Sequence, residues 1–168
     1  MDLHRYRFRS VWPVQVSVEE AYRALREVED YPAWWPEVRR TERVDDATYD
    51  MVVRSVLPYD LAFRTERSRE DPRAGVLEAR MVGDLEGFSR WSITPAAGGA
   101  TAVFEEQVQA RKPLLRRLGW LARPAFVANH TMMMRHGRAG LRAYLAGVRR
   151  GSGGGSGGGS GGGEKGRL

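Results

Sequence analysis

Two residues in the chain combine an acid–base side chain with a position expected to be buried. Glu106 lies in a segment of alternating apolar and polar residues, and His130 lies in a long segment with helical periodicity. A carboxylate and an imidazole can move a proton to or from a bound substrate. We therefore take His130 and Glu106 as the candidate catalytic residues, with Ser55 or Tyr144 as further hydrogen-bonding partners.

A structural role is the alternative for each of these two residues. A single helical histidine beside Asn129 is also typical of a hydrogen-bonded core residue. A one-residue bulge in the strand would turn Glu106 toward solvent. The sequence leaves both alternatives open.

Metal and cofactor chemistry find no support in the residue pattern. The chain has no cysteine, and His4, His130 and His136 have no mutual ligand spacing, since a separation of six residues places the last two on different helix faces. No glycine-rich phosphate loop or nucleophile elbow is present. We expect no metal site and no cofactor.

The element expected to carry His130 is one long helix over residues 124–148. Along it, large, small and polar residues recur at spacings of three and four, which places them on one helix face: Phe126, His130, Met133, Gly137, Leu141 and Tyr144. Arg135, Arg138 and Arg142 occupy the opposite face. A face that mixes aromatic rings, a thioether, an imidazole and glycine gaps predicts the wall of a cavity rather than a tightly packed core.

The segments before this helix predict an antiparallel sheet. Residues 3–12 alternate as a strand that Pro13 should end, a capping box at Ser17 and Glu20 opens a helix, and two prolines keep a second helix at 30–36 short. From residue 38 to residue 108, six short segments are separated by turn residues, which is typical of a meander of hairpins. Residues 38–44 show no clear register.

Inward positions of these strands, together with the mixed face of the helix, give the residues expected to line the cavity. They are Tyr6, Phe8, Ser10, Met51, Val53, Ser55, Phe63, Met81, Trp91, Phe104, Glu106, Phe126, His130, Met133, Met134, Gly137, Leu141 and Tyr144. Several are small or polar, whereas a sheet that only packs a helix is more uniformly apolar. We expect a cavity of at least about 300 Å³, as ligand sites usually have.

Composition predicts one domain over residues 1–150 and a flexible Gly/Ser tail over residues 151–168. The net charge is +6, and half of it comes from residues 149–168, so the domain lacks the basic footprint of a nucleic-acid-binding protein. The absence of cysteine and of a signal-peptide pattern predicts a cytoplasmic protein. Residues 111–123 form a basic amphipathic stretch, which either docks over the sheet or contacts an anionic membrane surface.

Several motifs, in this order, resemble one bacterial superfamily. They are YPAWWPEV at 31–38, GDLEG at 83–87 followed by Arg90 and Trp91, Asn129 with His130, and GRAGL at 137–141. The chain is similar over about residues 3–147 to the SRPBCC superfamily, in its START-like or polyketide cyclase/dehydrase branch. The resemblance implies an α+β helix-grip fold, in which a curved antiparallel sheet of about seven strands wraps around a long C-terminal helix and two short helices follow the first strand.

The resemblance also implies a function, though only at the level of a class. Superfamily members include carriers of lipids and quinones and aromatase/cyclases of polyketide synthesis. The expected function is the binding or carriage of a hydrophobic small molecule (lipid, quinone or polyketide-like) by a monomer or dimer. An aromatase/cyclase or dehydratase using His130 and Glu106 is the alternative, and an interaction module working through its outer surface is a third.

Overall fold

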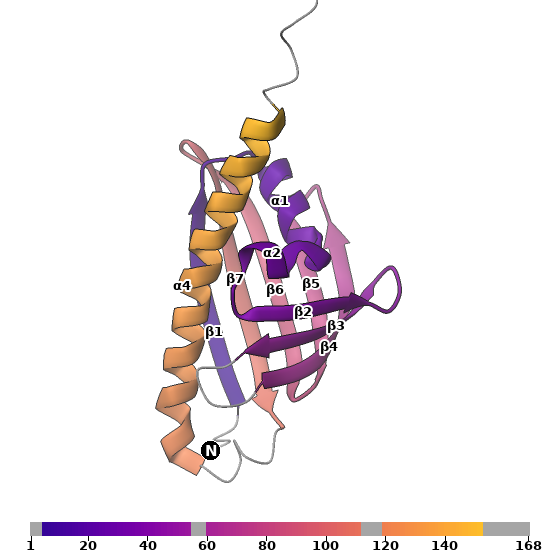
Figure 1. The fold of residues 1–168 in the computed structure, drawn as a ribbon, viewed down its shortest axis with the longest axis vertical. Coiled ribbons are helices and arrows are strands. Elements are labelled where there is room, and N and C mark those ends of the chain that lie inside the picture. The colour runs from indigo at the N-terminus through magenta and orange to yellow at the C-terminus, as the bar shows by residue number, and fades with distance from the viewer. Residues whose placement is uncertain (1–4, 55–59, 112–118, 153–168) are drawn as a thin grey trace, which may run out of the picture.

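A curved antiparallel sheet and one long helix dominate the computed structural model (Figure 1). The structure describes residues 5–54, 60–111 and 119–152, with side chains placed for all of these except 119–123 and 152. Its strands are β1 (Arg5–Val14), β2 (Val38–Arg43), β3 (Thr48–Arg54), β4 (Asp60–Asp71), β5 (Val76–Gly83), β6 (Leu85–Ala96) and β7 (Gly99–Ala110). Its helices are α1 (Val18–Arg26), the 3-10 turn η1 (Val28–Asp30), α2 (Tyr31–Trp34) and α4 (Gly119–Ser152).

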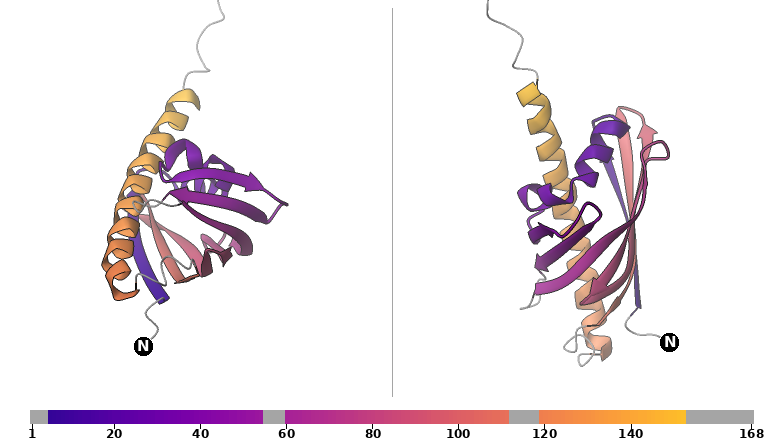
Figure 2. Two further views of the ribbon diagram at one scale, coloured as in Figure 1. Left: turned by 60° about the horizontal axis from the view of Figure 1, so that its bottom comes forward. Right: turned by 90° about the vertical axis from the view of Figure 1, so that its right-hand side faces the viewer.

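The seven strands follow the order β1-β7-β6-β5-β4-β3-β2, and every neighbouring pair is antiparallel. Strands β1 and β2 are therefore the two edges of the sheet. The sheet curves so that α4, α1 and α2 all lie on its concave side (Figure 2). This arrangement confirms the predicted helix-grip α+β fold.

Strand alternation decides which side chains face the concave side. In β7, Ala102, Phe104, Glu106 and Val108 are all buried, and the continuous register with β1 and β6 shows no bulge that would reverse their direction. Gly87 in β6 has φ +152°, and an added Cβ would collide with the backbone of Gln107 in β7. Only glycine permits the two strands to approach so closely at this point.

Tryptophan residues fill the two glycine gaps of α4, with side chains at Gly137 and with backbone at Gly140. A Cβ at Gly137 would lie 2.6 Å from Trp35 and 2.8 Å from Trp12, and one at Gly140 would collide with the backbone carbonyl of Trp34. The indole N–H of Trp35 donates to the carbonyl of Met133 at 3.0 Å, which ties the chain after α2 to α4. The sequence-based interpretation of these gaps as cavity wall was wrong, because residues about one hundred positions away occupy them.

Three local predictions also need correction. Strand β1 continues through Pro13 to Val14, which is possible because β1 is an edge strand and a proline there leaves no ladder hydrogen bond unmade. The unassigned residues 38–44 largely form β2, whose bulge between Val38 and Arg40 hides its alternation. Helix α4 begins at Gly119, so Pro124 lies inside it instead of opening it.

Capping places α1 where the sequence predicted it. Ser17 accepts from the backbone N–H of Glu20, whose carboxylate accepts from the N–H of Ser17. Helix α1 then buries Ala21, Tyr22, Ala24 and Leu25 against the concave side. No helix within the described residues is long and apolar enough to cross a membrane.

Candidate functional site

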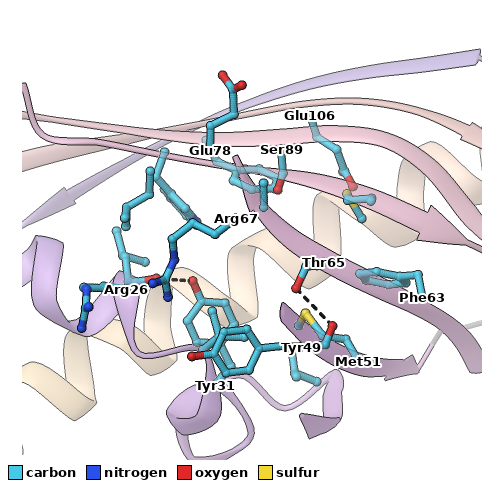
Figure 3. Close-up of a pocket in the computed structure, with 18 of the residues that line it drawn as sticks. Arg26, Tyr31, Tyr49, Met51, Phe63, Thr65, Arg67, Glu78, Ser89 and Glu106 are labelled. Carbon is cyan, nitrogen blue, oxygen red and sulfur yellow. Dashed lines mark hydrogen bonds between the residues drawn. The ribbon is translucent and has the colours of Figure 1, made fainter. Parts of the chain in front are cut away.

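A cavity of about 120 Å³ lies between the concave face of the sheet and the helices (Figure 3). Every strand except β1 contributes to its lining, together with α1, η1, α2 and Met133 of α4. Its apolar lining consists of Leu25, Val28, Trp35, Val38, Ala47, Met51, Val53, Phe63, Leu77, Ala79, Met81, Trp91, Phe104 and Met133. The volume is below the expected 300 Å³, so the cavity as it stands accommodates a group about the size of one aromatic ring.

A smaller pocket of about 50 Å³ lies beside this cavity, and Phe126, Asn129 and His130 of α4 contribute to its lining. Both spaces share Val53, Phe63, Glu106 and Met133 as lining residues. Glu106 therefore borders the cavity and the side pocket together.

Glu106 and His130 form a buried hydrogen-bonded pair. The Oε2 atom of Glu106 lies 2.9 Å from Nε2 of His130, and each side chain is only 8% exposed. The ring of Phe8 stacks on the imidazole at a centroid distance of 3.6 Å and an interplanar angle of 9°. Packing and hydrogen bonding thus hold the pair in one orientation, with the carboxylate toward the ligand spaces.

Further polar groups lie along the walls of the cavity. Thr65 donates to the carbonyl of Tyr49 at 3.4 Å, and Tyr31 donates to the carbonyl of Leu25 at 2.6 Å. Burial raises the pKa of Tyr31 above its ordinary value, so its hydroxyl stays protonated near neutral pH. Ser89 lies on the same sheet face as Glu106 and directs its hydroxyl toward the cavity (Figure 3).

An ion-pair cluster borders the cavity beside α1. Glu70 accepts from Nη1 of Arg67 at 2.8 Å and also from Nε of Arg26. The hydrogen bond from Arg26 is the main cause of a lowered pKa at Glu70. Both arginines line the cavity, so their charged groups and the carboxylate frame its polar end.

The structure brings together about half of the residues expected to line the cavity. Those that line the cavity or the side pocket are Met51, Val53, Phe63, Met81, Trp91, Phe104, Glu106, Phe126, His130 and Met133. Phe8, Ser10 and Met134 line a separate groove between β1 and α4, which His130 also borders. Ser55 lies outside the described residues.

Four other expected lining residues lie in packed regions. The ring of Tyr6 packs against that of Phe126 at 4.4 Å, and Leu141 is fully buried in the core. Gly137 contacts the tryptophans, and Tyr144 donates to Asp30 at 3.0 Å. Tyr144 is thus engaged with η1 and not with the Glu106–His130 pair.

Sequence reasoning missed several residues of the cavity wall. Thr65 and Ser89 continue the inward alternation of Phe63 and Trp91 but were not assigned to the site, and continued alternation along β4 would also have found Arg67. Tyr31 and Trp35 had no signal beyond their aromatic character, because their position depends on how α2 folds back over the sheet. Among the described residues, no group of acidic and histidine side chains could hold a metal ion.

Comparison with known proteins agrees with this geometry. Residues 5–146 match the family model described as polyketide cyclase/dehydrase and lipid transport. A search of curated protein sequences finds no match to this chain.

Solved structures show the same fold at low sequence identity. The Zhui aromatase/cyclase from Streptomyces sp. R1128 is 14% identical, with a TM-score of 0.75 over 90% of this chain and 99% of that one. A START superfamily protein from Mycobacterium smegmatis is 17% identical, with a TM-score of 0.63 over 86% and 99%. A STAR-related lipid transfer protein from Xanthomonas axonopodis is also 17% identical, with a TM-score of 0.53 over 81% and 85%. Because the family model matches nearly the whole described domain, the chain belongs to the polyketide cyclase/dehydrase and lipid transport family.

Proposed function

We propose that the protein binds or carries a hydrophobic small molecule in the cavity between the sheet and α4. The observation that carries this proposal is a space lined mainly by apolar side chains, with a single buried acid–base pair at its border. Apolar walls supply binding energy in proportion to the area that they remove from water, and a few fixed polar groups orient the ligand. This combination suits a ring system that carries a hydroxyl or carbonyl group.

The size of the cavity narrows the ligand class. A volume of about 120 Å³ holds one ring, so a larger ligand requires side chains to move. Met51, Met81 and Met133 all line the space, and unbranched thioether side chains change rotamer at little cost. A two-ring ligand that buries about 250 Å² of apolar area would gain roughly 6 kcal/mol. Before the costs of association this gain corresponds to a dissociation constant of about 40 μM, so we expect weak binding.

Filling the cavity tests this proposal. Ala79 lines the cavity, so Ala79→Phe would occupy the space that an uncharged fluorescent probe such as 2-naphthol enters. Ala143 is exposed on α4, so Ala143→Phe adds the same side chain outside the cavity and serves as the matched control. We expect the affinity for the probe, measured from its fluorescence, to fall at least about tenfold in Ala79→Phe and to stay unchanged in the control. Equal binding by both variants would contradict the proposal.

Catalysis is the second candidate, and the Glu106–His130 pair is the observation that favours it. In an aldol-type cyclisation, a base removes a proton next to a carbonyl, and the resulting enolate carbon attacks a second carbonyl, whose oxygen is protonated to a hydroxyl. An acid then protonates this hydroxyl, which leaves as water while a base removes a second α-proton. The 2.9 Å contact allows the proton to pass between the two side chains, and Glu106 faces both ligand spaces. A single pair could therefore serve both steps.

Substrate turnover separates the enzyme from the carrier. An aromatase/cyclase would convert a poly-β-carbonyl thioester to an aromatic product, and Glu106→Gln would lower that rate by about 100-fold or more while ligand affinity changes little. The carrier hypothesis expects binding of the same compound without turnover by either protein. A wild-type protein that binds the thioester and leaves it unchanged would refute the enzymatic alternative.

A further inference from the structure

A second concave site lies on the outside of the molecule, along the seam between the edge strand β1 and helix α4. It is a groove of about 250 Å³, lined by residues 8–12 of β1 and by residues of α4 between His130 and Arg138. Figures 1 and 2 show the two elements running side by side. The groove is separate from the cavity, since His130 is the one residue that borders both the groove and the interior side pocket.

Positive charge surrounds this groove. Arg9, Arg135 and Arg138 contribute to its lining. Among the residues that the structure describes, Arg135 and Arg138 form no ion pair with a carboxylate. The Nε atom of Arg9 lies 4.0 Å from a carboxylate oxygen of Glu105, which is a weak contact. Two unneutralised guanidinium groups beside a hollow favour an anionic occupant.

Backbone donors of β1 point into the same seam. The guanidinium of Arg142 donates to the carbonyl of Pro13 at 2.9 and 2.8 Å, so this carbonyl is directed away from β7 and toward α4. Strand β1 pairs with β7 without a register shift, and the backbone groups of every second residue point to the same side of a strand. The N–H groups of Val11 and Arg9 therefore face the seam, where β1 has no neighbouring strand.

We propose that this groove binds an oxyanion, the phosphate or carboxylate group of a small molecule or a lipid head group. Arg135 and Arg138 supply charge and planar paired donors, and the N–H of Val11 supplies a fixed backbone donor from the facing strand. Planar guanidinium groups match both oxyanions with two parallel hydrogen bonds. The carboxylate of Glu105 opposes binding, because it competes for Arg9 at the rim.

An amide-resolved NMR titration with inorganic phosphate, and separately with acetate, tests the site at constant ionic strength. The expected result is a set of saturable shifts at Val11 and at residues 134–138, together with the ring signals of His130. The double variant R135Q/R138Q should weaken binding by about tenfold or more, because it removes both charged donors. Glu105→Gln should strengthen binding a few-fold, since the charge that opposes the anion is lost.

The matched control is R39Q/R40Q, which removes two exposed arginines from β2, the other edge of the sheet. This variant changes the net charge equally, so its affinity should stay at the wild-type value. Shifts scattered over the whole surface, an equal loss in the control, or no saturable shifts with either anion would overturn the proposal. When the site binds, competition by phosphatidylglycerol vesicles but not phosphatidylcholine vesicles assigns the anion to a lipid head group, and absence of competition assigns it to a small molecule.

Discussion

Removing His130 alone from the Glu106–His130 pair should destabilise the protein far more than removing both members. In His130→Leu, the buried carboxylate of Glu106 loses its hydrogen-bond partner. A buried charged group left unpaired costs about 3 kcal/mol, and loss of the stack on Phe8 adds about 1 kcal/mol. We therefore expect His130→Leu to lower the free energy of unfolding by about 4 kcal/mol.

The costs of Glu106→Leu and of the double variant, which complete a double-mutant cycle, follow from the same reasoning. In Glu106→Leu, an imidazole nitrogen is left unpaired, at a cost of about 1 to 2 kcal/mol. In the double variant, two apolar side chains replace the pair, so the cost falls to about 1 kcal/mol, mostly from the lost stack. The coupling free energy between positions 106 and 130 is then about 4 to 5 kcal/mol.

Urea unfolding at neutral pH, followed by tryptophan fluorescence and circular dichroism, measures all four proteins. If the free energy of unfolding falls with urea concentration at the same slope in all four proteins, their unfolded states are comparable. If the double variant loses as much stability as the two single variants together, the pair is not an isolated buried couple and our reasoning is refuted. The expected result would show that the pair contributes little to stability, which agrees with a role in ligand binding or catalysis.

Three further predictions concern packing and pH. Gly137→Ala should lower the free energy of unfolding by about 1 to 3 kcal/mol, because the added methyl group meets two indole rings. Gly147→Ala has open space around it and should raise the free energy of unfolding by up to about 1 kcal/mol. Thermal unfolding compares the two variants, and equal effects would contradict the packing at Gly137. Glu70→Gln should lower stability by about 0.5 to 1 kcal/mol at pH 7 after allowance for solvent screening. Because Arg26 lowers the folded pKa of Glu70, the stability that the Glu70 carboxylate contributes is present above the ordinary glutamate pKa and disappears as pH falls through the folded pKa. A stability loss in Glu70→Gln that persists at pH 2 would argue against the ion pair. Tyr31→Phe should be less stable than the wild type at pH 7, and this difference should shrink as pH rises above the ordinary tyrosine pKa, because burial raises the folded pKa of Tyr31. Denaturant midpoints between pH 7 and pH 11 test this, and a pH-independent difference would contradict it.

Strand alternation predicted the direction of side chains well. A period of two placed Glu106 inward, and the unbroken register of β7 kept it there. The same rule failed in β2, because the bulge after Val38 breaks the period. Local pattern is therefore informative where the ladder is regular.

The contacts between distant elements could not be predicted in the same way. The 2.9 Å contact of Glu106 with His130 depends on how α4 is rotated and shifted over the sheet, which no local pattern contains. Gly137 and Gly140 of α4 were interpreted as gaps because the tryptophans that fill them come from β1 and from the segment around α2. For the same reason, the cavity is smaller than the mixed helix face suggested.

Methionine methyl NMR tests the proposed ligand cavity most directly. Met51, Met81 and Met133 line the cavity, whereas Met132 is 37% exposed on the neighbouring helix position and provides an internal control. On titration with an apolar two-ring compound such as 2-naphthol, we expect saturable ring-current shifts at the three lining methyl groups and none at Met132. Unchanged lining methyl groups, or a shift at Met132 as large as theirs, would contradict binding in the cavity.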